Sequence, residues 1–358
     1  MNNKSLVSTT GKFYNDATSG TTGKPKGVIL THENISTQVE ILTKAWKWNE
    51  NDTILHTLPL HHVHGIINAL FCPLSIGATT IMMPKFNSKE TWQHLLSGQV
   101  TVFMAVPTIY AKLIDSSDSV KKKLTAVRLM VSGSAPLPVP LYNKWLEITG
   151  HRLLERYGMT EIGMCLSNLY DSDREPGYVG LPLPSVTVAI ANDNGEILLQ
   201  CSNINGEITV TNNQPITGEL LVKGDSVFKE YYNKPTSQEF QNGWFKTGDI
   251  CQYINNKFRM LGRKSADIIK SGGYKISALQ IETILVEHPS VKECVVFGLT
   301  DDVYGERVTA VIVPTTTGQL TLQELKAWAT DKMPKYWIPS LLKVVEEIPK
   351  NAMGKRHL

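Results

Sequence analysis

The sequence has few cysteines, and none of them is placed for a disulfide framework or a redox motif. The five cysteines are widely spaced, and no two form a Cys-x-x-Cys pair: Cys72, Cys165, Cys201, Cys251 and Cys294. An odd number of scattered cysteines excludes a small disulfide-stapled fold and a cysteine-based zinc site. This pattern favours a reducing compartment.

A long apolar run and an excess of one charge are also missing. The most apolar stretch, residues 66–83, is interrupted by Asn68, Pro73 and Gly77, so it predicts a buried helix, a turn and a strand rather than a membrane span. The 36 basic and 33 acidic residues give a net charge of +3. Such a balance does not favour a nucleic-acid or membrane-surface partner, and an anionic ligand would need a local site. Residues 1–10 show no targeting pattern.

Strand and helix signals alternate through the first half of the chain. Residues 78–83, 100–106 and 127–131 read as buried strands, and Ile35, Leu42 and Trp46 lie on one face of a predicted helix. Residues 187–261 change to short strands with Asn/Gly-rich turns, which predicts a β-rich layer. The 358 residues suffice for about two domains.

The predicted fold class is therefore α/β. We expect a large layered α/β domain with a β-rich subdomain in residues 1–262. A small α+β domain, joined by a hinge, is expected in residues 263–358, with a helix that begins at the N-cap Ser277.

The strongest local signal is the segment of residues 18–27, which is rich in glycine, hydroxyl and lysine side chains. Its candidate phosphate-binding residues are Thr18, Ser19, Gly20, Thr21, Thr22, Gly23, Lys24 and Lys26. Glycines let the backbone approach an anion, hydroxyls and backbone N–H groups donate hydrogen bonds, and lysines supply charge. The segment is not a Walker A loop, because Pro25 stands where that motif needs Ser or Thr. A flexible linker would not need the Lys-Pro-Lys-Gly ending.

This segment resembles the phosphate loop of the adenylate-forming superfamily, which includes acyl-CoA synthetases, luciferases and peptide-synthetase adenylation domains. Later segments resemble further motifs of that superfamily in the same order: Tyr157-Gly158-Met159-Thr160-Glu161, Trp244-Phe245-Lys246-Thr247-Gly248-Asp249, Gly262-Arg263 and Pro349-Lys350-Asn351-Ala352-Met353-Gly354-Lys355. The resemblance covers nearly the whole chain and implies ATP-dependent ligation of a carboxylic acid to coenzyme A.

The resemblance implies a role for each segment in nucleotide binding. Glu161 would supply the Mg²⁺ carboxylate and Thr160 would bind a phosphate oxygen, while Asp249 and Arg263 would bind the ribose. The remaining nucleotide contacts, including those to adenine, would come from Gly133, Ser134, Ala135, Tyr157, Gly158 and Met159. Without the resemblance, Tyr157 would read as a core aromatic and residues 133–135 as an ordinary turn.

The two half-reactions are assigned to the C-terminal part in the same way. Lys355 resembles the catalytic lysine that bridges the acid and the α-phosphate. Lys270, Ser271, Gly272 and Gly273 resemble the segment that lines the route of the coenzyme A thiol after domain rotation, although a simple turn between strands is also compatible. The hinge lies among residues 264–267, with Ser265 at the position where relatives often carry an acid or a lysine.

The acid pocket is implied by residues 58–65, with His62 at the gating position. Three histidines in four positions also suggest a metal site, but the resemblance favours a pocket wall. The amino-acid sequences of several segments most resemble the malonate–CoA ligase branch, which implies malonate or methylmalonate as the acid. A buried second carboxylate needs a cation, preferably arginine.

The cation for that second carboxylate is not where this branch would place it. No arginine occurs in the expected helix of residues 88–96. The sequence leaves Lys85, Lys89 and His94 as weaker substitutes, and Arg128 or Arg156 as residues that reach in from elsewhere. An aliphatic or aryl monoacid is the alternative substrate.

The resemblance also implies that the chain is shortened at both ends, because the superfamily's phosphate loop follows a large N-terminal portion and its last helix follows the catalytic lysine. Two hypotheses therefore stand: a working ligase, and a nucleotide-binding remnant without turnover. A mitochondrial location is implied by resemblance only. The sequence does not indicate an oligomeric state.

Overall fold

The computed structural model describes residues 12–18, 26–117, 124–232, 239–315 and 320–349. The chain divides into two compact units: the first comprises Met1–Leu137, Leu141–Thr247 and Tyr253–Arg259, and the second comprises Pro138–Pro140, Gly248–Gln252 and Met260–Leu358. The expected domain boundary at residue 262 stays a prediction, because the second unit also takes two short earlier pieces.

A largely parallel sheet forms the centre of the first unit. Its strands run in the order β4-β3-β5-β6-β7-β8-β9, and neighbours from β4 to β7 are parallel whereas β8 and β9 pair antiparallel. The bounds are β3 (Thr53–His56), β4 (Thr79–Met82), β5 (Val102–Ala105), β6 (Leu129–Ser132), β7 (Leu154–Met159), β8 (Gly163–Ser167) and β9 (Leu181–Pro182). The three strands predicted at residues 78–83, 100–106 and 127–131 are confirmed as β4, β5 and β6.

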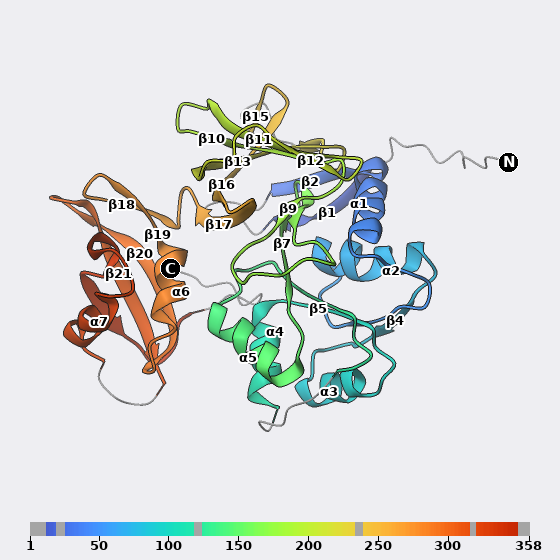
Figure 1. The fold of residues 1–358 in the computed structure, drawn as a ribbon, viewed down its shortest axis with the longest axis horizontal. Coiled ribbons are helices and arrows are strands. Elements are labelled where there is room, and N and C mark those ends of the chain that lie inside the picture. Colours follow the sequence, from blue (N-terminus) through green and yellow to red (C-terminus); the bar gives the residue numbers. More distant parts are fainter. Residues whose placement is uncertain (1–11, 19–25, 118–123, 233–238, 316–319, 350–358) are drawn as a thin grey trace. The chain divides into compact units, whose positions relative to one another are not determined.

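Helices alternate with the parallel strands along the chain (Figure 1), and α3, α4 and α5 contribute buried aromatic side chains to the core. They are α1 (His32–Ala45), α2 (Cys72–Ser75), α3 (Ser88–Leu96), α4 (Pro107–Asp115) and α5 (Val139–Thr149). Trp145 is fully buried, with its ring centroid 4.9 Å from that of Tyr110 and 5.7 Å from that of Trp92. α1 begins after Thr31, whose hydroxyl accepts the Asn34 N–H at 3.1 Å and so caps the helix.

The apolar stretch of residues 66–83 forms a helix, a turn and a strand, as predicted. Its helix is wound as a π-helix, η1 (His64–Phe71), and this local i→i+5 winding is not encoded in the apolar pattern. In the part of the chain that the structure describes, no helix is long and apolar enough to cross a membrane.

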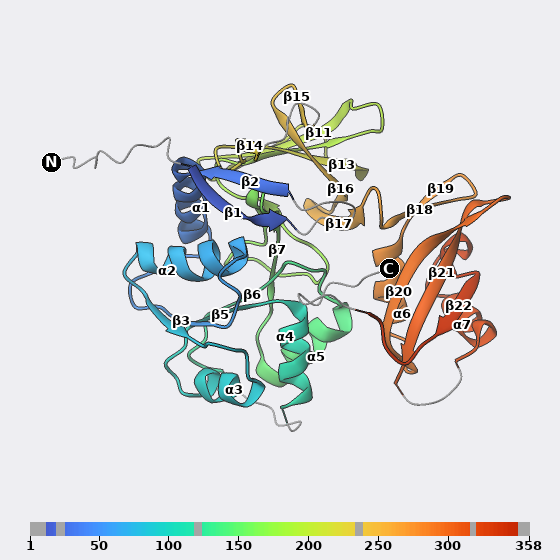
Figure 2. The ribbon, with the colours of Figure 1, turned by 180° about the vertical axis from the view of Figure 1, so that it is seen from behind.

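The β-rich layer predicted for residues 187–261 is present. Its sheet runs in the order β12-β11-β10-β13-β16-β15, with β17 beside β16. The strands are β10 (Thr187–Ala191), β11 (Ile197–Ile204), β12 (Glu207–Val210), β13 (Ile216–Lys223), β15 (Phe240–Gln241), β16 (Trp244–Ile254) and β17 (Lys257–Arg263). A small antiparallel sheet contains β1 (Lys12–Thr18), β2 (Lys26–Thr31) and β14 (Glu230–Tyr231), of which Figure 2 shows β1 and β2 side by side.

In the second unit, α6 and α7 pack on one face of a mixed sheet ordered β19-β18-β21-β20, with β22 beside β21. Its elements are β18 (Ile268–Ser271), β19 (Tyr274–Ser277), α6 (Ala278–Leu285), β20 (Val291–Asp301), β21 (Gly305–Pro314), α7 (Leu322–Ala329), the 3-10 helix η2 (Lys335–Trp337) and β22 (Leu341–Val344). Alternate strand residues such as Val296 and Ala310 meet Ile281 of α6 and Leu325 of α7. Ser277 caps α6 as predicted, because its hydroxyl accepts the Gln280 N–H at 3.2 Å.

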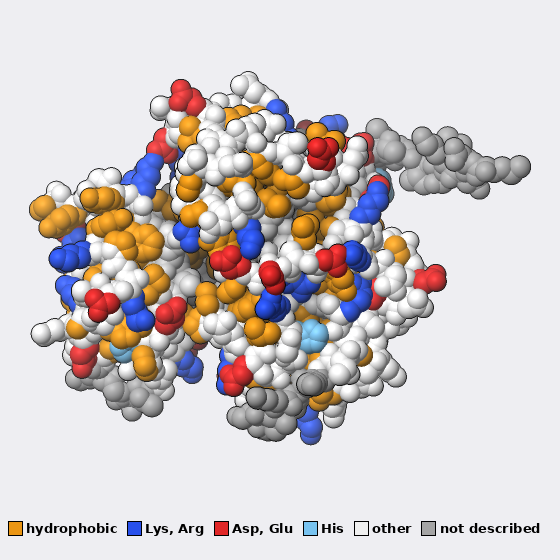
Figure 3. All heavy atoms as spheres, viewed as in Figure 1, with side chains coloured by type: hydrophobic (Ala, Val, Ile, Leu, Met, Phe, Trp, Pro, Cys, Tyr) orange, Lys and Arg blue, Asp and Glu red, His pale blue; other side chains and the backbone are white. Residues whose placement is uncertain are grey.

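The surface agrees with the near balance of charge in the sequence. On the face shown in Figure 3, lysine and arginine side chains are interspersed with aspartate and glutamate rather than gathered in a patch of one sign. On this face, recognition of an anion would therefore need an individual built site.

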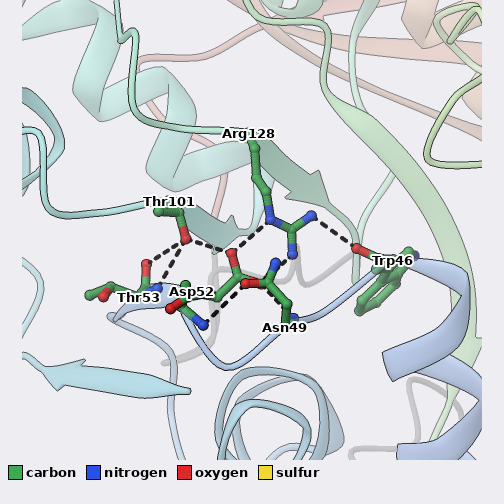
Figure 4. A network of polar contacts seen from close by, with 7 residues as sticks. Trp46, Asn49, Asp52, Thr53, Thr101 and Arg128 are labelled. Carbon is green, nitrogen blue, oxygen red and sulfur yellow. Dashed lines mark hydrogen bonds and ion pairs between the residues drawn. The ribbon is translucent and has the colours of Figure 1, made fainter. Parts of the chain in front are cut away.

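An ion pair between the buried Asp52 and the half-buried Arg128 joins the amino ends of three parallel strands (Figure 4). The Asp52 carboxylate, before β3, accepts the Arg128 Nε–H at 2.7 Å and the Thr101 hydroxyl at 2.8 Å. The Arg128 Nη1–H donates to the Trp46 carbonyl at the end of α1, at 3.1 Å. Ligands of open parallel sheets bind at the carboxyl ends of the strands, so this network lies at the edge away from the expected site.

Candidate active site

Glu161 lies at the tip of the hairpin between β7 and β8. The two strands approach so closely that a Cβ on Gly158 would lie 2.2 Å from the Gly163 carbonyl oxygen, and Gly163 itself has a φ of 61°. Glu161 is buried and Thr160 is half-buried, and the Tyr231 hydroxyl donates to Glu161 Oε1 at 2.9 Å. The hairpin therefore holds the carboxylate in a defined orientation.

A second group of residues surrounds the buried Arg156 at the middle of β7. Its Nη2–H group donates to the Ser134 hydroxyl at 3.4 Å, and the Ser134 hydroxyl lies 3.2 Å from Nδ1 of His64. A Cβ on Gly133 would lie 2.5 Å from the guanidinium carbon, so any other residue there would displace the arginine from its present position. Ser134 and Ala135 are exposed, which leaves this edge open to solvent.

The electrostatics of this group favour an anion. Burial lowers the pKa of Arg156 to about 9, so the guanidinium remains charged at neutral pH. Burial first, and then the charge of Arg156, hold the pKa of His64 well below its usual value, so the imidazole is neutral. Within the described ranges no carboxylate pairs with Arg156, and its Nε–H has no hydrogen-bond partner. The group therefore carries one buried, uncompensated positive charge.

The structure separates the two arginines that the sequence left open. Arg128 is committed to Asp52, whereas Arg156 has no acidic partner in the described part of the chain. The weaker candidates Lys85 and Lys89 are exposed, and His94 is half-buried near the end of α3. Asn68 on η1 is fully buried, and neither its side-chain nitrogen nor its side-chain oxygen has a hydrogen-bond partner. The sequence did not single out this residue as a site residue.

The histidines of residues 61–64 point to different partners. The rings of His61 and His62 lie 4.2 Å apart, whereas His64 contacts Ser134. The described residues contain no group of three or more His, Cys, Asp or Glu side chains that could hold a metal ion. His62 is half-buried, and its gating role stays a prediction.

The adenine assignment of residues 133–135 also stays a prediction. The structure places Gly133 and Ser134 against Arg156 rather than leaving them as a simple turn. Tyr157 is half-buried on β7, between Arg156 and Gly158. Met159 ends the strand, where the hairpin tip begins.

In the second unit, the two predicted ribose residues meet. Arg263 Nε lies 3.0 Å from Asp249 Oδ1, so the two side chains form an ion pair. Asp267 closes the following turn, because its Oδ2 accepts the Arg263 backbone N–H at 2.7 Å. Gly262, with a φ of 123°, precedes this turn. The residues proposed as a hinge therefore lie in a turn that is closed by hydrogen bonds to Arg263.

The predicted coenzyme A segment is a two-residue hairpin turn. Ser271 pairs with Tyr274, and Gly272 and Gly273 have φ values of 55° and 83°, as a turn of this type requires. A Cβ on Gly273 would meet nothing within 4 Å. The turn interpretation is confirmed, and the role of Lys270 and its neighbours toward coenzyme A stays a prediction.

Several predicted site residues lie outside the described residues. These are Ser19, Gly20, Thr21, Thr22, Gly23 and Lys24 of the phosphate segment, and the catalytic candidate Lys355. Thr18 ends β1, and Lys26 begins β2, which pairs with it. The strands that enter and leave the phosphate segment are therefore neighbours.

Glu155, beside Arg156 on β7, provides a test of burial in this strand. Burial raises the pKa of its carboxyl to about 8, opposed by a hydrogen bond from the Gly177 N–H. When the pKa of a carboxyl is higher in the folded state, the protein loses stability as the pH rises from the unfolded-state pKa of that group toward its folded-state pKa, here about 8. We expect Glu155→Gln to gain stability relative to the native chain between pH 5 and 8, by up to about 1.4 kcal/mol per pH unit.

Urea unfolding at pH 5, 6.5 and 8 measures this difference. Glu147→Gln is the control, because the Glu147 side chain is 58% exposed on α5. A difference between Glu155→Gln and the native chain that does not change with pH would contradict the assignment.

Comparison with known proteins gives a consistent result. The model of the AMP-binding enzyme family matches residues 17–232, and that of the AMP-binding enzyme C-terminal domain matches residues 280–355. The chain is 49% identical to malonate–CoA ligase ACSF3, mitochondrial, of Mus musculus over 96% of this chain and 62% of that protein. It is 44% identical to malonate–CoA ligase of Arabidopsis thaliana over 96% of this chain and 60% of that protein.

Solved structures agree with these relatives. ATP-bound MatB from Rhodopseudomonas palustris superposes with a TM-score of 0.86 at 33% identity, over 96% of this chain and 66% of that chain. The chain thus spans about 62% of the length of the animal relatives it matches. The first family model alone covers more than half of the sequence, and the order of motifs agrees with it. The chain belongs to the AMP-binding enzyme family.

Proposed function

We propose that the protein activates a short dicarboxylic acid, malonate or methylmalonate, to its adenylate with ATP and then transfers the acyl group to coenzyme A. The observation that carries this proposal is the buried Arg156, which has no acidic partner among the described residues and lies beside an open edge at Ser134. A buried unpaired charge is costly, so a ligand carboxylate that pairs with it gains affinity.

The chemistry follows from the weakness of a carboxylate as an electrophile. The acid carboxylate attacks the α-phosphorus of ATP and pyrophosphate leaves; the coenzyme A thiol then attacks the acyl carbonyl, loses its proton, and AMP leaves. Rate enhancement in the first step depends on alignment and on neutralising charge at the phosphates. Mg²⁺, when bound with ATP, would supply part of the positive charge that neutralises the phosphates.

The proposed roles divide among the residues as follows. Residues 18–26 bind the phosphates, and Lys355 bridges the acid and the α-phosphate. Glu161 would hold Mg²⁺, and Thr160 would bind a phosphate oxygen. Asp249 and Arg263 bind the ribose, and the hairpin of residues 270–273 lines the route of the thiol. A single deeply placed carboxylate such as Glu161 fits Mg²⁺, which is usually held by one or two carboxylates together with substrate phosphates.

A mitochondrial location is part of the proposal. It is supported by the relative from Mus musculus, whose name carries that location. Small acids, ATP and coenzyme A are the proposed binding partners.

ATP–pyrophosphate exchange with a panel of acids tests the function. Malonate, methylmalonate, butyrate and benzoate should be compared at equal concentrations. We expect exchange with the two dicarboxylates to exceed that with the monoacids. Preference for a monoacid would refute the substrate class, and no exchange with any acid, together with retained ATP binding, would establish a nucleotide-binding remnant.

A prediction for Lys355 separates the two half-reactions. Lys355→Ala should lower malonyl-adenylate formation by about 10²- to 10³-fold, because it removes a charge that stabilises the first transition state. Coenzyme A attack on supplied malonyl-adenylate should remain near the native rate. Lys350→Ala, five residues earlier, is the matched control. Equal losses in both steps would overturn the assigned role.

A further inference from the structure

The proposed metal carboxylate is held by a residue far away in the sequence. Tyr231, on the two-residue strand β14, donates its hydroxyl hydrogen to Glu161 Oε1 at 2.9 Å. Both side chains are buried, with exposed fractions of 5% for Tyr231 and 4% for Glu161. This hydrogen bond fixes one carboxylate oxygen and so determines where the other oxygen lies.

The backbone around β14 holds the same hairpin tip from a second side. The Phe228 N–H donates to the Glu161 carbonyl at 2.7 Å, and the Ser226 hydroxyl donates to the Ile162 carbonyl at 3.1 Å. The ring of Phe228 also packs against Tyr231, with centroids 4.8 Å apart. Both the main chain and the side chain of Glu161 are therefore positioned by this segment.

The other side of β14 is joined to the end of the phosphate segment. Tyr231 pairs with Val28 of β2, and the Tyr232 N–H donates to the Gly27 carbonyl at 2.7 Å. The Lys26 ammonium lies over the Tyr231 ring, 4.9 Å from its centroid. One aromatic ring thus contacts both a lysine of the proposed phosphate site and the proposed metal carboxylate.

We infer that Tyr231 is a positioning residue that orients the Glu161 carboxylate for the metal–phosphate complex and ties that orientation to the end of the phosphate segment. The inference rests on the proposed function. Mg²⁺ requires nearly ideal octahedral geometry, so a rotated carboxylate binds it less well. Loss of a hydrogen bond to a metal ligand typically costs about 10- to 100-fold in metal affinity or activity.

The test measures ATP binding rather than turnover. Calorimetric titration gives the ATP dissociation constant with Mg²⁺ and with EDTA. The value in EDTA divided by the value with Mg²⁺ reports how much the metal strengthens ATP binding. We expect Tyr231→Phe to reduce this ratio by about 10- to 100-fold. Binding of ATP in EDTA should change by less than about threefold, because the phenylalanine ring retains the packing and the contact with Lys26.

Two further variants make the test specific. Tyr253→Phe is the matched control, because it removes a hydroxyl from another buried tyrosine, whose partner is Asn256. In the Glu161→Gln background, Tyr231→Phe should cause little further loss, because both changes act on the same metal contact. Thermal unfolding of each variant verifies that the chain remains folded.

The outcomes distinguish this inference from the proposed function. An unchanged ratio in Tyr231→Phe, or equal weakening with and without Mg²⁺, would overturn the positioning role while leaving the function intact. Fully additive losses in the double variant would overturn it as well. A native chain that does not bind ATP under either condition would overturn the proposed function together with this inference.

Discussion

Replacing Arg156 with methionine is expected to lower malonate-dependent pyrophosphate exchange, measured as kcat/KM, by roughly 30- to 4000-fold. Removing one partner of a buried, hydrogen-bonded charge pair costs about 2 to 5 kcal/mol, and each 1.4 kcal/mol is tenfold. Much of that loss arises because the second carboxylate of malonate would then be buried without a cation. Exchange with butyrate, which has no second carboxylate, should fall far less.

Stability separates this effect from a folding defect. Arg156 in the ligand-free protein is a buried cation without an acidic partner in the described residues, so methionine should leave the unfolding temperature unchanged or raise it. Arg152→Met is the control, because Arg152 forms an ion pair with Asp173 in which both side chains are more than half exposed. Equal losses for malonate and butyrate would show that Arg156 does not recognise the second carboxylate.

Arg128→Met should have a large effect of the opposite kind, on stability rather than on substrate choice. The Asp52 side chain is 2% exposed and would lose its cationic partner. Breaking a buried pair by removing one member costs about 3 to 5 kcal/mol, whereas exposed pairs contribute about 0 to 1 kcal/mol. Urea unfolding should show this loss, and Lys144→Met, in an exposed pair with Glu147, should not.

The pH dependence provides a second check on Arg128. Burial by itself would raise the pKa of Asp52, but hydrogen bonds from Arg128, Asn49 and Thr101 more than offset it, and the net pKa is lowered. A carboxyl with a lowered folded pKa contributes stability above its unfolded value, and this contribution is lost as pH falls through the folded value. The destabilisation by Arg128→Met should therefore be largest near neutral pH and shrink below about pH 4. A loss below about 1 kcal/mol at pH 7 would contradict the buried-pair interpretation.

The fold class and several individual elements were readable from the sequence, because they depend on local signals. Periodic apolar residues indicated α1 and the buried strands β4, β5 and β6, and the capping hydroxyl of Ser277 indicated where α6 begins. The winding of η1 was not readable, because a π-helix differs from an α-helix by one residue per hydrogen bond while keeping similar apolar positions.

The proposed nucleotide residues were also named from contiguous motifs, each a short run of residues in a fixed order. Glu161 and Arg263 were predicted from such motifs alone. The choice between Arg128 and Arg156 could not be made from the sequence, because both arginines stand at or beside predicted strands and differ only in their partners. Tertiary structure distinguishes their surroundings, because it places Asp52 against Arg128 and leaves Arg156 beside Ser134.

Sequence by itself thus determined the family resemblance, the fold class and the identity of most candidate residues, since these are written in local patterns and in their order. Tertiary structure alone decided which charges are neutralised and which side chains orient one another. The contact between Tyr231 and Glu161 joins residues 70 positions apart, one on β14 and the other in the turn between β7 and β8 of a different sheet. No local signal encodes such a contact, because it exists only after β14 pairs with β2 beside the hairpin tip.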